Sequence, residues 1–220
     1  ERAEQIESEQ GRTVGRKEMR ELRDRVAEEL LPRAFTRSSR TYAYLDTHNQ
    51  LLVIDAASDK KAESLLTLLR KSLGSLPLQP LATQSAPTTI MTQWLKGEIV
   101  SGDFTPLDEC ELRDSEDEGA VIRCRRLALE SGDIDHHLEA GMIAQKLAVE
   151  WRERLRCVLD ANLRISRLRF NDVVTEELDA IDSRDAAALF DAQFVLMALE
   201  LRQLIPALLD AFGGEAEHRT

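Results

Sequence analysis

The sequence lacks the patterns typical of a membrane protein, a disulfide scaffold or a secreted protein. No apolar run approaches the roughly 18 residues of a membrane-spanning helix, and no secretory signal is visible. The 3 cysteines, Cys110, Cys124 and Cys157, are an odd set without CxxC spacing, which argues against a disulfide framework and a cysteine-rich zinc site. We therefore expect reduced thiols in a cytoplasmic protein that has no membrane partner.

Common catalytic motifs are also missing. The chain has no GxSxG elbow, no phosphate-binding P-loop and no GxGxxG fingerprint. His136 and His137 stand beside Asp133 and Asp135, but adjacent histidines on a helix point about 100° apart and rarely share one metal ion. We predict no catalytic residue, no metal, no cofactor and no small-molecule substrate. A metal-dependent nuclease using Asp133, Asp135 and His136 remains a minor hypothesis.

What the chain has is charge, in separate blocks. The formal net charge is -11, with 40 acidic residues against 29 lysines and arginines. Residues 107–118 and 171–220 are strongly acidic, whereas residues 151–170 hold 6 arginines and 2 acids. A protein that is acidic overall can therefore still present one basic surface to a polyanion.

The segment LLPRAFTRSSR (30–40) is basic and contains no acid. Arg33, Arg37 and Arg40 could bind phosphate, because the planar guanidinium matches phosphate oxygens. The plain alternative is a solvated basic loop, or salt bridges to the acidic blocks. Phe35, which lies among these arginines after a helix-ending proline, is either a core residue or an interface residue.

Other cations recur at regular spacing. Lys60 and Lys61 occupy the first turn of a predicted helix, where the helix dipole disfavours them, and Arg70 and Lys71 complement its C-terminal end. Alternation places Arg123 and Arg125 on one face of a strand, with Arg126 beside them. The same alternation predicts a basic β-ribbon from the residues Arg152, Arg154, Arg156, Arg167 and Arg169. The plain alternative is the solvent face of a half-buried sheet.

Hydrophobic periodicity predicts a mixed α+β fold. We expect helices over 1–31, 58–73, 88–96 and 133–139, and strands over 41–47, 50–56, 119–129, 142–151, 152–160 and 164–170. The segment 142–151 could also be a helix. Residues 76–82 should be extended, and the acidic segment 107–118 should be an exposed loop or boundary. The C-terminal third should be helical, with Pro206 bending the helix or beginning a second one. The predicted regions are 1–40, 41–106, 107–170 and 171–220.

Several blocks, in order along nearly the whole chain, resemble the bacterial recombination-associated RdgC family. They are LLPRAF (30–35), DAASDKKAESLLTLLRKSLGSLP (55–77), GAVIR (119–123), EAG (139–141), KLAVEW (146–151), RLRF (167–170) and the C-terminal FDAQFVLMALEL, LI and GGEA. Family members are longer, and the resemblance implies a further N-terminal segment that contributes to a central sheet.

The resemblance implies a nucleoid-associated, non-enzymatic protein that binds double-stranded DNA with little sequence preference. It implies a horseshoe-shaped protomer of several subdomains with mixed or antiparallel sheets, which pairs into a ring-shaped homodimer around DNA and limits access of the RecA recombinase. An alternative is a protein-interaction module of the recombination machinery without direct DNA contact. The expected dimer-interface residue is Phe35. The expected DNA-binding residues are Arg33, Arg37, Arg40, Lys60, Lys61, Arg70, Lys71, Arg123, Arg125 and Arg126.

Overall fold

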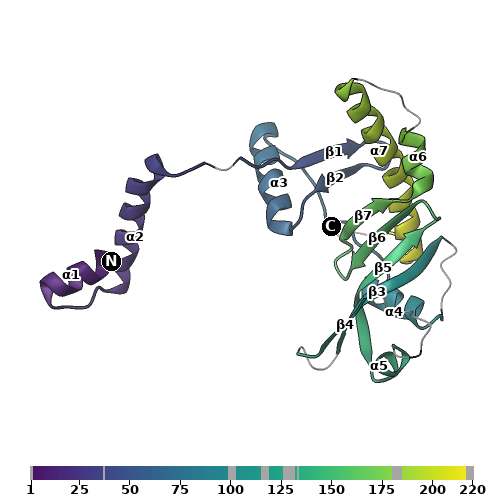
Figure 1. Cartoon of the computed structure of the whole chain (residues 1–220), viewed down its shortest axis with the longest axis horizontal. Helices are drawn as coiled ribbons and strands as arrows, with labels where there is room; N and C mark the ends of the chain where they lie inside the picture. Colours follow the sequence, from purple (N-terminus) through teal and green to yellow (C-terminus); the bar gives the residue numbers. More distant parts are fainter. Residues whose placement is uncertain are drawn as a thin grey trace. The chain divides into compact units, whose positions relative to one another are not determined.

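The chain folds as an α+β protein with antiparallel strands, as the sequence predicted (Figure 1). The structure is a computed structural model that describes residues 2–36, 38–98, 103–114, 119–125, 132, 134–179 and 185–216. The chain divides into two compact units, Glu1–Thr41 and Tyr42–Thr220, and each is described by itself.

The first unit is a pair of helices, α1 (Arg2–Gln10) and α2 (Arg16–Leu30), followed by the 3-10 turn η1 (Leu31–Arg33). The prediction of one helix over 1–31 was wrong. Gly11 adopts a φ of 64°, which a glycine reaches without strain, and the chain turns back there. Arg2 near the start of α1 pairs with Glu29 near the end of α2 at 2.7 Å, so the two helices are antiparallel.

The second unit begins with the predicted hairpin and its helix. Strands β1 (Tyr42–Asp46) and β2 (Leu51–Asp55) pair antiparallel, and α3 (Asp59–Leu73) follows. Ser58 caps α3 by accepting a hydrogen bond from the Lys61 amide at 3.4 Å, and Gly74 ends it with a φ of 78°. The predicted short helix over 88–96 is α4 (Pro87–Leu95).

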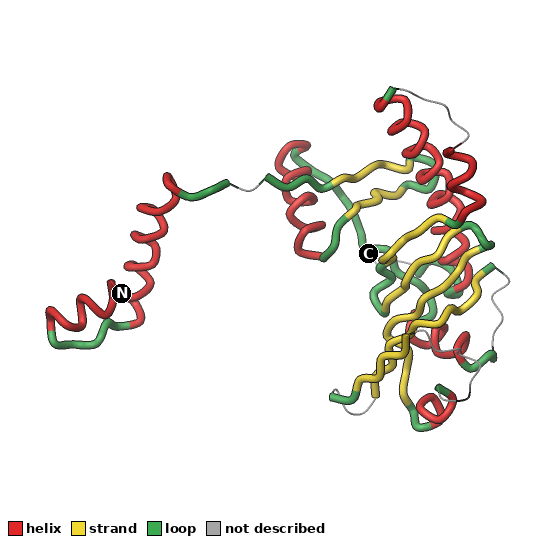
Figure 2. The backbone as a smooth tube through the Cα atoms, viewed as in Figure 1, coloured by secondary structure: helices red, strands yellow, loops and turns green. Residues whose placement is uncertain are grey.

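A five-stranded antiparallel sheet forms the centre of this unit, in the order β4-β3-β5-β6-β7 (Figure 2). The acidic segment 107–118 was predicted as a loop, which is wrong for residues 107–114, because they belong to an interior strand. The reason is alternation: Cys110 and Leu112 are buried while Glu109 and Glu111 point to the opposite face. The strands are β3 (Phe104–Asp114), β4 (Val121–Arg125), β5 (Met142–Trp151), β6 (Leu155–Asp160) and β7 (Ile165–Phe170).

The predicted strand over 152–160 begins later than expected. Residues 152–154 form the turn between β5 and β6, and Arg152 and Glu153 both have positive φ, 47° and 55°. Arg152 and Arg154 therefore do not share a strand face with Arg156, and the predicted basic ribbon is wrong for these two. The predicted hairpin that joins β6 to β7 is confirmed.

Two helices cover one face of the sheet, and the main core lies between them and the strands. Trp94 of α4 stacks between Phe104 and Phe212, with ring centroids 5.6 Å and 5.5 Å apart. Leu204 and Leu208 of the long helix α7 (Ala186–Ala211) are buried in the same cluster. The remaining helices of the described residues are α5 (Asp135–Glu139) and α6 (Asp172–Asp179).

Helix α7 continues through Pro206, so no second helix begins there. Proline has no amide hydrogen, which leaves the Arg202 carbonyl, four residues earlier, without its helical donor. The Asn49 side chain from the β1–β2 turn donates to that carbonyl at 3.0 Å. Arg202 in turn donates to the buried Asp46, at 3.2 Å from Nε, and these contacts fix the hairpin to α7. Among the described residues α7 is long and apolar enough to span a membrane by length and composition alone, and in this fold Glu200, Leu201, Leu204 and Leu208 of its C-terminal half are buried.

Candidate nucleic-acid interface

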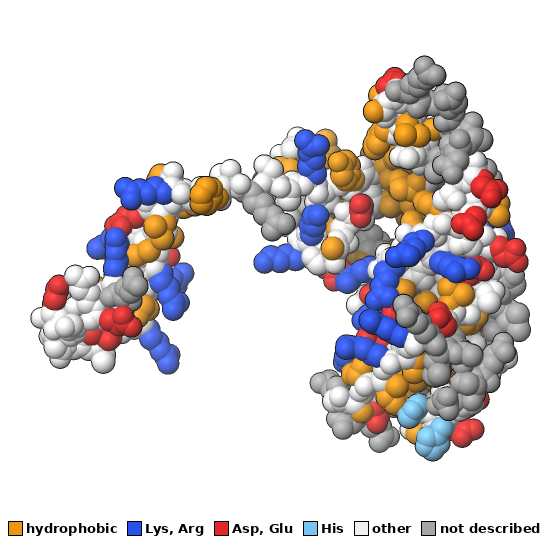
Figure 3. Space-filling view, viewed as in Figure 1, with side chains coloured by type: hydrophobic (Ala, Val, Ile, Leu, Met, Phe, Trp, Pro, Cys, Tyr) orange, Lys and Arg blue, Asp and Glu red, His pale blue; other side chains and the backbone are white. Residues whose placement is uncertain are grey.

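The sheet face opposite the core carries charged side chains from several strands. Lysines and arginines follow the strands in the space-filling view, with acidic side chains between them (Figure 3). Alternation places these residues on one face, because β3, β4, β5 and β6 each bury every second side chain in the core. The basic residues of this face are Arg113, Arg123, Arg125, Lys146, Arg156, Arg167 and Arg169.

Two glutamates of β3 hold four of these cations. Glu111 Oε2 accepts from Arg123 Nε at 2.9 Å and from Lys146 Nζ at 3.2 Å. Glu109 accepts from Arg167 Nη1 at 2.6 Å, and Arg125 Nε lies 3.4 Å from its Oε1. Both carboxylates are therefore shared between cations on different strands.

Arg167 reaches β3 across two intervening strands. It is the bulged residue of β7, with a φ of 52°, at the point where the β6–β7 register shifts. The Arg167 side chain crosses β5 and β6 above Ala148 and Val158. These two small apolar residues are direct cross-strand partners. The four cations, Glu109, Glu111, Cys110 and Val158 line a depression of about 150 Å³.

The carboxylates lie deep and the cations lie outside. The side chains of Glu111 and Glu109 are only 14% and 26% exposed, whereas Arg123 and Arg125 are each 66% exposed. A polyanion approaching this face therefore meets guanidinium groups first. Arg113 and Arg169, also exposed, make no ion pair within the part of the chain that the structure describes.

Hydrogen bonds and neighbouring cations lower the pKa of two carboxyls on this face, Glu111 and Glu150. Burial alone would raise the pKa of Glu111, but hydrogen bonds from Arg123 and Lys146 outweigh it, so its pKa is lowered. Hydrogen bonds from Asn171 and then Arg156 lower the pKa of Glu150 on β5. The face thus has a fixed set of anions beneath a larger set of cations at neutral pH.

One end of α3 lies beside the sheet. Arg164, just before β7, pairs with Asp59 in the first turn of α3 at 2.7 Å. Lys60 and Lys61 follow Asp59 directly, so the structure brings these predicted residues to the β6–β7 end of the sheet. Arg70 and Lys71 lie at the other end of α3, where Arg70 is 3.6 Å from Glu63.

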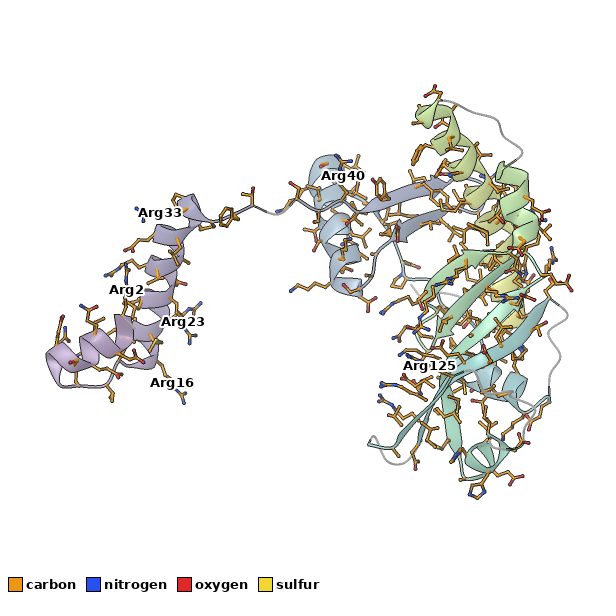
Figure 4. The ribbon with its side chains drawn as sticks, viewed as in Figure 1. Arg2, Arg16, Arg23, Arg33, Arg40 and Arg125 are labelled. Carbon is orange, nitrogen blue, oxygen red and sulfur yellow. The ribbon has the colours of Figure 1, made fainter. Side chains whose placement is uncertain are left out.

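Other predicted residues lie in the first unit or outside the described residues. Arg33 is in η1 and Arg40 lies two residues before β1, and both are exposed (Figure 4). Phe35 is fully exposed, so it fills no core within this chain. Arg37 and Arg126, like Asp133, lie outside the described residues.

Two arginines of the predicted ribbon have structural roles. Arg154 makes a bidentate pair with Glu200 of α7, at 2.6 Å from Nη2 and 2.9 Å from Nε, and Glu200 is 3% exposed. Arg152 pairs with Asp103 at 2.9 Å, and its guanidinium lies 5.0 Å from the centre of the Trp151 ring. Sequence reasoning missed Lys146, although its position in the alternating KLAVEW strand was the available signal.

No group of three or more histidines, cysteines or acids that could hold a metal ion occurs among the described residues. The rings of His136 and His137 on α5 are tilted by 57° to each other, with centroids 5.8 Å apart.

Comparison with known proteins assigns the family. A family model described as "Putative exonuclease, RdgC" matches residues 1–215. This chain belongs to the RdgC family. Proteins named recombination-associated protein RdgC from Pseudomonas paraeruginosa and Yersinia enterocolitica are 45% and 44% identical to it, each over 98% of this chain. The matches cover 70% and 71% of those two RdgC proteins.

Proposed function

We propose that this RdgC chain binds double-stranded DNA without sequence preference and acts in recombination and replication. The observation that carries the proposal is the exposed sheet face, where guanidinium groups cover the partly buried Glu109 and Glu111. The carboxylates of the glutamates lie deeper than the guanidinium groups. The exposed arginines can therefore exchange a carboxylate partner for a DNA phosphate by a change of side-chain conformation. Repeated cations with no built pocket for a base suit contact with the sugar–phosphate backbone.

The acidic remainder of the chain restricts where DNA binds. With a net charge of -11, most of the surface repels a polyanion, and only a basic face attracts it. Nonspecific binding of this kind has dissociation constants of about 10⁻⁴–10⁻⁶ M at physiological salt, and it weakens steeply as salt rises.

Fluorescence anisotropy with labelled random duplexes over a salt series tests the proposal. Replacing Arg123 and Arg125 with Gln should weaken binding to all sequences alike and reduce the slope of log K against log salt by about 1–2. Lys96→Gln combined with Arg152→Gln is the charge-matched control, because Lys96 follows α4 and Arg152 lies in the β5–β6 turn. Equal losses in the two double variants would contradict the assignment of this face.

The assembly is proposed to be a ring-shaped homodimer of horseshoe-shaped protomers that encloses duplex DNA, in the cytoplasm and associated with the nucleoid. The full exposure of Phe35, close in sequence to the exposed Leu30 and Leu31, supports a role at a protomer junction, because groups of exposed apolar side chains mark interfaces. Phe35→Ala should leave the thermal midpoint unchanged while it reduces the dimer fraction in light scattering. An unchanged dimer fraction would contradict a role of Phe35 at the junction.

Occupation of duplex DNA would limit access of RecA. Addition of the protein should therefore lower DNA-dependent ATP hydrolysis by RecA, and Arg123→Gln with Arg125→Gln should restore it. The proposal includes no catalytic role, in contrast to the exonuclease wording of the family description. Incubation with linear duplex and magnesium should leave the DNA intact, and cleavage that co-purifies with the protein would contradict this part.

A further inference from the structure

Helix α2 carries a row of arginines with no partner within the described residues. Arg16, Arg20 and Arg23 are spaced four and three residues apart, so they lie within about 60° of one another around the helix. All three are exposed and make no ion pair with any described residue. Arg16 and Arg23 project from the same side of α2 (Figure 4).

Two other arginines of the same unit, Arg2 and Arg12, are paired. Arg12 makes a bidentate contact with Glu18, at 2.6 Å and 2.7 Å, and Arg2 contacts Glu29. Asp24 lies four residues after Arg20 but forms no ion pair with it. The three arginines of the row thus form no ion pair with the described residues, although the unit has acids that pair with Arg2 and Arg12.

The row also conflicts with the stability of its own helix. Arg16 lies in the first turn of α2, where the helix dipole disfavours a cation. Arg16 and Arg20 repel each other at a spacing of four residues. Local conflicts of this kind are typical of residues that serve a ligand.

We propose that Arg16, Arg20 and Arg23 form a second phosphate-binding surface for DNA, separate from the sheet face. The row is about 10 Å long, at 1.5 Å per residue, which matches about three phosphates along one strand of a duplex. The apolar stripe of α2 is partly buried at Met19, Leu22 and Val26 and exposed at Leu30, at the end of the helix away from Arg16.

This inference rests on the proposed DNA binding, but it concerns a different unit of the chain. Two sites in one chain would bind a duplex bivalently, so that each site raises the effective concentration of DNA at the other. Loss of either site should then weaken binding without abolishing it.

The test compares three double variants of the full chain in the same anisotropy salt series. Arg16→Gln with Arg23→Gln should weaken binding about tenfold at low salt and reduce the log–log slope by about 2. The control, Lys17→Gln with Arg25→Gln, removes the same charge from the side of α2 that carries Glu21 and Glu28, and it should change binding less than about twofold. Arg123→Gln with Arg125→Gln reports on the sheet face, and circular dichroism confirms that each variant is folded.

The outcomes separate the two proposals. Equal effects of the two α2 double variants would show a response to net charge alone and overturn the second site. An unchanged affinity for Arg16→Gln with Arg23→Gln, beside a loss for Arg123→Gln with Arg125→Gln, would overturn the second site and keep the first. A wild-type protein that binds no duplex at low salt would overturn both.

Discussion

The two faces of the five-stranded sheet use the same strands for opposite purposes. The covered face holds Trp94, Phe104 and Phe212 against apolar strand residues, and it sets the stability of the unit. The open face holds Glu109 and Glu111 beneath arginines, and it has few apolar contacts to lose. Substitutions on the first face should therefore act on folding, and substitutions on the second should act on DNA.

The largest expected effect is on the covered face. Trp94→Ala should lower the free energy of unfolding by about 4 kcal/mol, because it removes a large ring that stacks on two others. Urea denaturation measures this loss. Leu68→Ala on the exposed side of α3 is the control and should cost less than about 0.5 kcal/mol. A small effect of Trp94→Ala would contradict the position of the core.

Glu200, the partner of Arg154, is buried on the covered side of the sheet. Arg154 itself belongs to the basic block 151–170 of the sequence. Arg154→Met should cost about 3 kcal/mol, because it leaves a nearly inaccessible carboxylate without its partner. Arg152→Met, which breaks an exposed pair, should change the urea midpoint little. Equal midpoints for the two variants would remove the distinction between them.

On the open face the glutamates should weaken DNA binding at neutral pH. Glu109→Gln with Glu111→Gln frees four cations from competing carboxylates and should tighten duplex binding about tenfold, with a steeper salt slope. Because the pKa of Glu111 is lowered, its stabilising ion pairs are complete above about pH 4.3, its usual value, and are lost as the pH falls through the lower folded value. The difference between variant and wild type should shrink over that acidic range. Unchanged affinity at pH 7 would contradict competition by the glutamates.

The smallest effect concerns the thiols of the covered face. Burial and then the neighbouring Cys124 thiol raise the pKa of Cys110 to about 12, and burial raises the pKa of Cys157 to about 12. Both thiols should therefore stay protonated at pH 8.5 and react slowly with iodoacetamide in the native protein. Peptide mapping after labelling should find mostly Cys124, which is partly exposed, and urea should make all three react.

Much of the fold could be read from the sequence where apolar periodicity was strong. The hairpin β1–β2, helix α3 and the strands β5 and β7 follow their patterns, whereas β6 begins three residues later than predicted. The segment 107–114 was predicted as a loop because of its many acidic residues. The alternation of the apolar residues Cys110 and Leu112, which indicates a strand, was given less weight. The ion pairs that make Glu109 and Glu111 acceptable in an interior strand come from other strands and are not local in sequence.

The candidate site was predicted less completely, for similar reasons. The cations of β4 were predicted correctly from alternation. The positive φ of Arg152 and Glu153 was not predictable, because neither residue is a glycine or asparagine, the types that usually adopt it. Arginines in one block thus separate into a turn, a buried pair and an open face. Their roles depend on the burial of the partner carboxylate, which only the tertiary structure provides.

The two edges of the sheet restrict how copies of the protein can meet. The edge strand β4 is short and presents Arg123 and Arg125, and the edge strand β7 is distorted by the bulge at Arg167. Such edges oppose the addition of another strand, because an added strand cannot form a continuous ladder of backbone hydrogen bonds with them. Pairing of two sheets edge to edge through β4 or β7 is therefore disfavoured, and the arginines that disfavour it also face DNA in the proposed complex.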